Sequence, residues 1–298
     1  MSTTTRLPSH FTRNGRIWPI FKKTFWRIVL YAILFGLAAL VILPLGWMFT
    51  VALKPDNTPV FTLPPEFFPT KYFQWSNFTD ALANPKQPFL RFTLNTLIIF
   101  AGTVIGSVLS CTMVAYAFSR LRFRGKNLLF NILIITMLIP GAVLMIPTFI
   151  MYFKLGWYGT YLPLIVPSFF ANAFFVFLIR QYMATLPHEL DEAARIDGCN
   201  FFQIYWYIIL PLTRPVIAVQ VVFIFLSCWG DLLGPLIYLD KTENFTVAIG
   251  LANFATRADP NTNQLMAANL NMMLPPIILF AFAQKQLIGG IASVGLKG

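Results

Sequence analysis

The side chains that most often carry catalysis or hold metal ions are scarce in this sequence. Histidine occurs only at His10 and His188, and the three cysteines, Cys111, Cys199 and Cys228, lack the spacing of a metal-binding or redox motif. The sequence therefore has too few histidines for a histidine-based metal site and offers little basis for a Ser-His-Asp triad. The sequence also contains no Walker A glycine loop and no glycine-rich dinucleotide turn. We expect that the chain is not an enzyme, binds no cofactor or metal ion, and does not itself hydrolyse ATP.

Polar side chains inside apolar segments offer a different chemistry, because such groups are costly in lipid and tend to face an interior or a water-filled path. Six residues are candidates for contact with a solute on such a path: Asn172, Gln181, Trp229, Asp231, Asn269 and Asn271. Amides and a carboxylate can match the hydroxyls of a sugar, and an aromatic ring can cover its apolar face. The same side chains could instead form hydrogen bonds between helices. Asp231 also falls near the external end of its segment, where water would solvate it.

The composition of the chain indicates that these residues lie in a membrane protein. Hydrophobic residues make up 57% of the sequence and charged residues 11%, with a mean hydropathy of +0.68. Soluble domains usually carry about a quarter charged residues. The apolar residues form runs long enough to cross a hydrocarbon core roughly 30 Å thick. We predict an all-α membrane protein with six transmembrane helices, at about residues 25–51, 92–118, 128–153, 161–183, 212–238 and 265–289. Prolines such as Pro140 and Pro147 are expected to kink these helices and open space around a pathway.

The sequence divides into four parts. Residues 1–24 are predicted to be a basic cytoplasmic tail, and residues 25–53 the first transmembrane span. This span is too long for the apolar core of a signal peptide and lacks a small-residue cleavage site, so we expect it to remain uncleaved. Residues 54–89, rich in proline and aromatic residues, are expected to form a compact extracytoplasmic loop. Residues 90–298 form the core domain, which contains an informative loop at residues 184–211.

Lysine and arginine residues indicate how the chain is oriented. The net charge of +11 could suggest a nucleic-acid partner, but topology explains it better, because cytoplasmic loops of membrane proteins are enriched in these residues. With a cytoplasmic N-terminus, the cytoplasmic side collects about twice as many of them as the opposite side. The densest cluster, Arg120-Leu-Arg-Phe-Arg-Gly-Lys126, lies in a short loop, where the rule is most reliable. We predict that both termini are cytoplasmic and that no nucleic acid is bound.

The loop at residues 184–211 is predicted to form two short helices joined by a glycine turn. Pro187 suits a first helical turn, and the acidic residues that follow favour the positive end of a helix. Gly198 can adopt the left-handed conformation that ends a helix. Asn200 and Gln203 have the spacing of a capping box for the second helix. The adjacent Ala193 and Ala194 would give the first helix a small face that another protein could approach, although the helix could also be a solvated linker between two spans.

This loop resembles the permease subunits of binding-protein-dependent ABC importers. The pattern Glu-Ala-Ala, three residues, Gly, nine residues, Ile-x-Leu-Pro is matched at Glu192, Ala193, Ala194, Gly198, Ile208, Leu210 and Pro211. The resemblance narrows to the carbohydrate-uptake branch, and specifically to the second permease of maltose and glycerol-phosphate systems. The residues that carry it are Ala115-Tyr-Ala-Phe-Ser-Arg120, Arg180-Gln-Tyr-Met183, Arg195-Ile-Asp197-Gly198, Leu210-Pro-Leu-Thr-Arg-Pro215 and the ending Gly295-Leu-Lys-Gly298. Two departures, Trp229-Gly230-Asp231 and Ala268-Asn269, weaken any analogy about the substrate.

The resemblance implies a five-helix permease core with one extra N-terminal span, in the inner (plasma) membrane of a bacterium. It also implies partners: a homologous second permease, an ABC ATPase dimer that uses ATP and Mg²⁺, an extracytoplasmic solute-binding protein, membrane lipid, and a sugar or polyol substrate. The residues expected to couple to the ATPase are Glu192, Ala193, Ala194, Asp197, Gly198, Leu210 and Pro211. An ion-coupled secondary transporter of small polar solutes is the alternative, although no convincing internal repeat is found. The substrate stays open among a disaccharide, a glycosylated polyol, glycerol-3-phosphate and related solutes.

Overall fold

The computed structural model describes residues 17–55, 68–69, 72–83, 88–256 and 261–295, and within these ranges the side chains of residues 23–284. All regular structure in the described residues is helical, which confirms the predicted all-α fold. Most of the predicted basic tail (residues 1–24) and the C-terminal tail (residues 295–298) lie outside the described residues. In chain order the helices are α1 (Ile17–Ala52), α2 (Ser76–Ala83), α3 (Phe89–Arg120), α4 (Lys126–Thr136), α5 (Gly141–Lys154), α6 (Leu162–Ile165), the 3-10 helix η2 (Val166–Phe170), α7 (Ala173–Met183), α8 (Glu189–Ile196), α9 (Phe201–Gln203), the π-helix η3 (Ile204–Ile209), α10 (Leu210–Leu212), α11 (Arg214–Gly230), α12 (Leu233–Tyr238), the 3-10 helix η4 (Thr242–Asn244), α13 (Val247–Ala255) and α14 (Thr262–Gly295).

Helices long and apolar enough to cross a membrane occur at most of the predicted places. Four qualify alone, at Lys23–Ala52, Phe89–Arg120, Leu162–Met183 and Thr262–Gln284. Two bent helix pairs, α4 with α5 and the Phe201–Leu212 stretch with α11, bring the total to six if each pair counts as one span. The described residues are therefore consistent with the six predicted spans.

Three spans differ in shape from the prediction, and one of them, residues 161–183, is interrupted at Ala171, which has φ +57°. Residues 128–153 were expected to form one helix, but α4 and α5 meet at 93°. Pro140 is the cap residue of α5 and has an extended backbone conformation, so a continuous helix is interrupted there. Residues 212–238 were also expected to form one helix, but α11 ends at Gly230 because Asp231 is extended, and α12 is a separate short helix.

The loop at residues 54–89 is more ordered in its described part than its composition suggests. It contains α2, whose Asn77 side chain donates to the carbonyl oxygens of Ala52 and Lys54 at 2.9 and 2.8 Å. Asn263, on α14, donates to the carbonyl oxygens of Lys54 and Pro55 at 3.1 and 2.7 Å. These bonds fasten the end of α1 to both α2 and α14.

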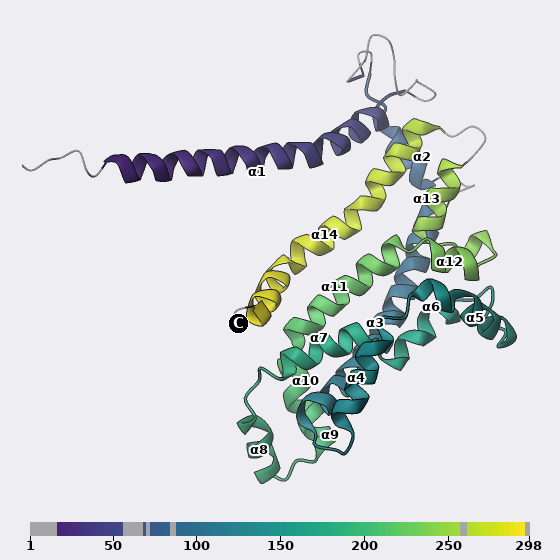
Figure 1. Cartoon of the computed structure of the whole chain (residues 1–298). Coiled ribbons are helices and arrows are strands. Elements are labelled where there is room, and N and C mark those ends of the chain that lie inside the picture. The colour runs from purple at the N-terminus through teal and green to yellow at the C-terminus, as the bar shows by residue number, and fades with distance from the viewer. Residues whose placement is uncertain (1–16, 56–67, 70–71, 84–87, 257–260, 296–298) are drawn as a thin grey trace, which may run out of the picture.

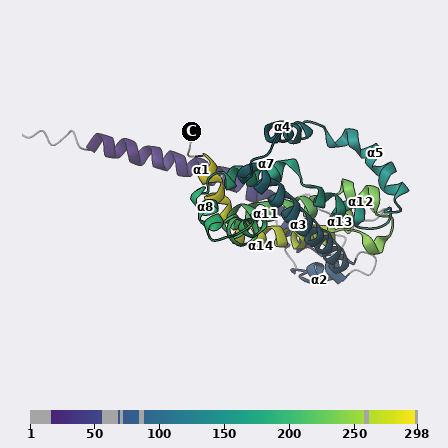
Figure 2. The same ribbon diagram turned by 90° about the horizontal axis from the view of Figure 1, so that it is seen from below.

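Two clusters of buried side chains lie along the bundle. One joins α3, α7 and α11 to the α8–α10 region, and the other joins the end of α1 to α2, α3, α11, α13 and α14. Figure 1 shows the short helices α8 and α9 at one end of the molecule, with α2 at the other, while α1 projects away from the bundle. Figure 2 shows α4 and α5 as an arm along one side. Helix α3 runs between the two ends and contacts α2, α6, η2, α7, η3, α11, η4 and α13.

Candidate functional site

The segment between α7 and α11 has the local structure that the sequence predicts. Helix α8 carries three acidic residues in its first turn, where they favour the positive end of the helix. Gly198 has φ +84°, a conformation that glycine adopts without steric cost. The Asn200 side chain accepts from the backbone N–H of Gln203, and the Gln203 side chain accepts from that of Asn200, which completes the predicted capping box. Pro187 precedes the helix instead of joining its first turn, because α8 begins after the cap residue His188.

Helix α8 has an inner and an outer face. Asp191 and Ala194 are buried against the bundle, whereas Glu192, Ala193 and Ile196 are exposed, Ile196 by 87%. The expectation that both alanines form one small outer face is therefore wrong for Ala194, which packs into the protein's own core. Asp197 and Gly198 are exposed beyond the end of the helix. Leu210 and Pro211 lie at the start of α10, next to α11.

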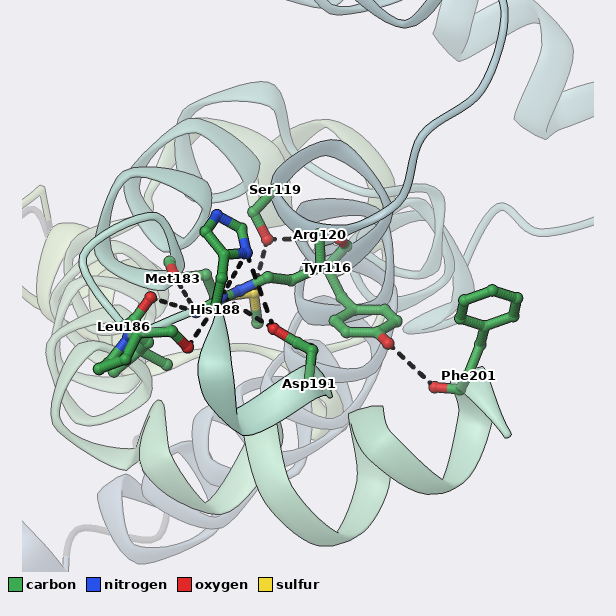
Figure 3. A network of polar contacts seen from close by, with 9 residues as sticks. Tyr116, Ser119, Arg120, Met183, Leu186, His188, Asp191 and Phe201 are labelled. Atoms are coloured by element: carbon green, nitrogen blue, oxygen red, sulfur yellow. Dashed lines mark hydrogen bonds and ion pairs between the residues drawn. The ribbon is translucent and has the colours of Figure 1, made fainter. Parts of the chain in front are cut away.

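Arg120, the last residue of α3, holds α8 against the transmembrane bundle, as Figure 3 shows. Its Nη1 donates to the Asp191 carboxylate at 2.9 Å. Its Nη2 donates to the backbone carbonyl oxygens of Met183 and Leu186 at 2.7 and 2.8 Å. One guanidinium group thus joins the end of α3, the end of α7 and the first turn of α8.

The side chains of this ion pair are buried. Only 1% of the Arg120 side chain and 9% of the Asp191 side chain are exposed. Nη1 also lies 3.3 Å from the carbonyl oxygen of Pro187 and 3.1 Å from Nδ1 of His188. In the part of the chain that the structure describes, Oδ1 of Asp191 and Nε of Arg120 have no hydrogen-bond partner. A buried pair of this kind is destabilised strongly when one partner is removed, because the other charge is left uncompensated.

Sequence reasoning assigned Arg120 to membrane topology and missed this contact. The available signal was its place at the end of the apolar run, ahead of the rest of the basic cluster. A cation in such a position must find an anion or carbonyl oxygens.

A second set of contacts joins α3 to the helices after Gly198. Tyr116 donates its hydroxyl to the carbonyl oxygen of Phe201 at 3.1 Å. The hydroxyls of Thr112 and Tyr205 are 2.8 Å apart in a buried hydrogen bond. Helix α8 and the helices that follow it are therefore both attached to α3.

A cavity of about 700 Å³ lies beside α8, and we call it the α8 cavity. Its walls come from α8, Phe201 and the connection between α3 and α4. Charged residues line it on both sides, with Arg122 in the connection between α3 and α4 and with Glu192 and Arg195 on α8. None of these three forms an ion pair with a described residue. The outer face of α8 and this cavity therefore present unpaired charges of both signs to a partner.

The six polar candidates in the spans are not brought together in one site. Five of them are engaged in contacts within the protein: Trp229 donates to the Met272 carbonyl, Asn271 to that of Phe78 and Asn269 to that of Leu265, while Asp231 accepts from the Gly234 N–H and Gln181 from Arg180. Asn172 caps α7 and lines a second cavity, which lies among α3, η2, α7 and α11. Only the bonds of Trp229 and Asn271 join different helices, so the alternative of hydrogen bonds between helices describes two of the six.

The described residues contain no group of three or more histidine, cysteine or acidic side chains that could hold a metal ion. The three cysteines are free thiols.

Comparison with known proteins places this geometry among transport proteins. The family described as "Binding-protein-dependent transport system inner membrane component" matches residues 102–292. The arabinooligosaccharides transport system permease protein AraQ of Bacillus subtilis (strain 168) is 30% identical over 273 residues, which cover 92% of this chain and 96% of that protein. The sn-glycerol-3-phosphate transport system permease protein UgpE of Pectobacterium atrosepticum is 32% identical over 247 residues, covering 81% and 87%.

Among solved structures, a bacterial ABC transporter involved in import of the acidic polysaccharide alginate has a similar chain. It superposes with a TM-score of 0.76 over 93% of this chain and 99% of the other, at 22% identity. The same kind of transporter in complex with its alginate pentasaccharide-bound periplasmic protein gives a TM-score of 0.63, at 17% identity, over 90% of this chain and 96% of the other. These two comparisons support the fold.

Proposed function

Because this chain belongs to the family of binding-protein-dependent transport system inner membrane components, we propose that it is one permease subunit of an ATP-driven ABC importer for a sugar or sugar-like polyol. It is a multi-pass inner-membrane transport protein and not a catalytic enzyme. Membership of this family favours the importer over an ion-coupled secondary transporter.

The choice of a carbohydrate rests on the relatives. Their names specify arabinooligosaccharides and sn-glycerol-3-phosphate, and the structural neighbour is involved in the import of alginate. All of these solutes carry several hydroxyl groups. A polyhydroxylated solute is therefore the class of substrate that we assign to this chain.

The observation that carries the coupling role is the clamped helix α8. Its inner face is fixed by Arg120 and Asp191, and its outer face offers Glu192 and Ile196. We assign this outer face, with the α8 cavity, to the ATPase subunit. ATP and Mg²⁺ would be bound by that subunit and not by this chain. Closure of the ATPase dimer would move α8, and the Arg120 contacts would pass the movement to α3 and α7. Such a movement need only favour one of two packings of the spans.

The remaining partners follow from the same assignment. A homologous second permease would complete the pathway, and an extracytoplasmic binding protein would deliver the substrate, as the periplasmic protein in the alginate complex suggests. Both termini and α8 would face the cytoplasm, in agreement with the distribution of basic residues.

Affinity purification of the tagged chain in mild detergent tests the assembly. We expect an ABC ATPase and a second permease to co-purify. A chain that purifies alone, stable and without an ATPase, would contradict the proposal.

Substitutions in α8 and in the turn that follows it test the coupling. Gly198→Pro should uncouple ATP hydrolysis from uptake, because proline cannot adopt φ +84° and loses the N–H that donates to the Arg195 carbonyl at 3.0 Å. Glu192→Lys should do the same by reversing an exposed charge on α8. The control is Glu243→Lys, in the exposed helix η4, well away from α8 in the chain. The measurement is uptake per ATP hydrolysed in proteoliposomes. A normal ratio of uptake to ATP hydrolysis in both the Gly198→Pro and the Glu192→Lys variant would refute the coupling role.

A further inference from the structure

The fourth span is interrupted in its middle. Helix α6 continues into η2, which ends at Phe170. Ala171 then has φ +57°, and α7 begins after the cap residue Asn172. Left-handed backbone at a residue other than glycine is strained and clusters at functional sites. Within a membrane, non-helical backbone is tolerated only where it is buried in protein or lines a cavity. The break therefore marks a place where the span opens onto an internal space.

The interruption is held by side chains of α3. The Ser110 hydroxyl donates to the carbonyl oxygen of Ser168 at 2.9 Å and accepts from the backbone N–H of Ala171 at 3.2 Å. Gly106 allows η2 to lie close to α3, because a Cβ atom there would come within 2.5 Å of the Phe169 ring. The polar backbone groups at the break are thus satisfied within the protein. This makes the break a fixed feature of the fold.

A cavity of about 540 Å³, which we call the α7 cavity, adjoins this break. Its volume is in the range typical of small-molecule sites. Phe170 is 79% exposed, and the rings of Phe174 and Phe223 meet edge to face with centroids 6.1 Å apart on the cavity wall. None of the described residues that line the cavity is charged.

Two polar groups on the wall remain free to bind a ligand. The Oδ1 atom of Asn172 accepts from the N–H groups of Phe174 and Phe175, which leaves the Nδ2 amide as a donor. Neither this amide nor the exposed hydroxyl of Ser227 has a hydrogen-bond partner among the described residues. Aromatic rings beside an amide donor and a hydroxyl match the apolar face and the hydroxyl groups of a sugar ring.

We propose that the α7 cavity is the substrate-contacting site of this subunit and that it selects uncharged saccharides over anionic ones. The proposal rests on the function proposed above and specifies its substrate class. A cavity with no cation in its walls cannot compensate a phosphate or carboxylate group, and burying an unpaired charge is costly. Glycerol-3-phosphate and alginate, the solutes in the names of two similar proteins, both carry such a charge. We therefore expect this chain to differ from those proteins in the charge of its solute.

Two substitutions test the site by uptake into vesicles that carry the whole transporter. Asn172→Asp keeps an oxygen that can cap α7 but removes the amide donor and adds a negative charge. Ser227→Ala removes the free hydroxyl. Each should lower uptake of a neutral oligosaccharide by about five- to tenfold, mainly through KM. Thr136→Val is the control, because Thr136 is exposed and its hydroxyl donates only to the Leu133 carbonyl. Unchanged KM values in both cavity variants would overturn the proposal.

Cys228 provides a second readout, because it lies in the wall of the same cavity. In a Cys199→Ser background it is the one partly accessible thiol, since Cys111 is buried. A small maleimide should label Cys228 several-fold more slowly when neutral pentose or hexose oligosaccharides are present. Equal concentrations of glycerol-3-phosphate should leave the rate unchanged. Protection by glycerol-3-phosphate alone, or none by a saccharide that is taken up, would overturn the proposal.

The outcomes separate this inference from the proposed function. ATP-dependent saccharide uptake without protection of Cys228 would refute the cavity assignment and leave the importer role intact. Failure to transport any of the neutral oligosaccharides or glycerol-3-phosphate would instead contradict the proposed sugar importer.

Discussion

Arg120 shows how one residue can connect a membrane helix to a surface helix. Its planar guanidinium donates at once to a carboxylate on α8, to a backbone carbonyl at the end of α7 and to another in the connection between these helices. Lysine, with a single ammonium group, could not reproduce this arrangement. Since a buried ion pair contributes little net stability compared with apolar packing, its value here is the fixed orientation of α8.

Replacing Arg120 should therefore affect both stability and coupling. Arg120→Ala leaves the buried Asp191 carboxylate without its partner, and we expect a loss of about 3–5 kcal/mol in the free energy of unfolding. Uptake per ATP hydrolysed should fall as well. Thermal unfolding of the purified complex and transport in proteoliposomes measure the two effects. Arg124→Ala is the matched control, because Arg124 is exposed in the connection between α3 and α4 and does not line the α8 cavity.

A double variant separates the effect of a wrongly oriented α8 from the effect of an uncompensated buried charge. Arg120→Met combined with Asp191→Leu should recover most of the stability, because apolar residues can replace a buried pair. Uptake should stay low, since the bonds to Met183 and Leu186 are still missing. Normal coupling in Arg120→Ala would show that these contacts do not transmit movement.

The residue-level features that the sequence predicted are local ones. The Gly198 turn and the box of Asn200 with Gln203 depend on neighbours within three residues, so their spacing is sufficient to predict them. The partner of Arg120 lies 71 positions along the chain. The burial of Ala194 likewise depends on tertiary packing. No local pattern could predict either one.

Helix α3 is the element on which the other parts of the site are assembled. It contacts η2, α7 and α11 and ends at Arg120. Gly102 and Gly106 have the spacing of a GxxxG motif, which brings helices close together in membranes. Cβ atoms at these positions would come within 2.7 Å of Ile165 and 2.5 Å of Phe169. The close approach places Ser110 within reach of the break at Ala171.

Adding a methyl group at Gly106, where α3 contacts η2, should force these two elements apart. We expect Gly106→Ala to destabilise the complex by about 1–3 kcal/mol, the usual cost of overpacking. The loss should be seen as a lower thermal unfolding temperature, with weaker saccharide uptake. Gly36→Ala on α1 is the matched control, because no atom lies within 4 Å of the added Cβ there. Equal unfolding temperatures for the two variants would contradict the close-packing argument.

At the scale of elements, hydropathy predicted where most of the spans lie but not how they bend. Apolar composition is the same on both sides of a bend, so the 93° angle between α4 and α5 leaves no trace in it. Pro140 predicted a kink there but not the size of the angle. The break at Ala171 has no glycine or proline at the left-handed position itself. It follows from the contacts with Ser110 and Gly106.

The whole molecule has surfaces that this chain does not cover by itself. Helix α1 is apolar on every side, and the window that would span the membrane is not buried at all within the chain. An apolar helix of this kind needs lipid or another membrane helix around it. Only its C-terminal end is attached to the bundle in this way, because Asn77 and Asn263 donate hydrogen bonds to the carbonyl oxygen of Lys54, just after that end. The molecule thus has a firmly joined end at α2 and a clamped helix α8 at the other (Figure 1).

The orientation of these two ends can be tested directly. If α8 faces the cytoplasm, a membrane-impermeant maleimide added to intact spheroplasts should label Thr79→Cys, exposed on α2, and should not label Ile196→Cys, exposed on α8. Both variants belong in a background in which Cys111, Cys199 and Cys228 are replaced. In cells that express this chain without the ATPase, Ile196→Cys should react as fast as Thr79→Cys after the membrane is opened with detergent, which shows that protection came from the membrane and not from packing. Labelling of Ile196→Cys in intact spheroplasts would show that the orientation is the opposite of the one proposed. It would place α8 on the side of the membrane that has no ATP, and the coupling role would fail with it.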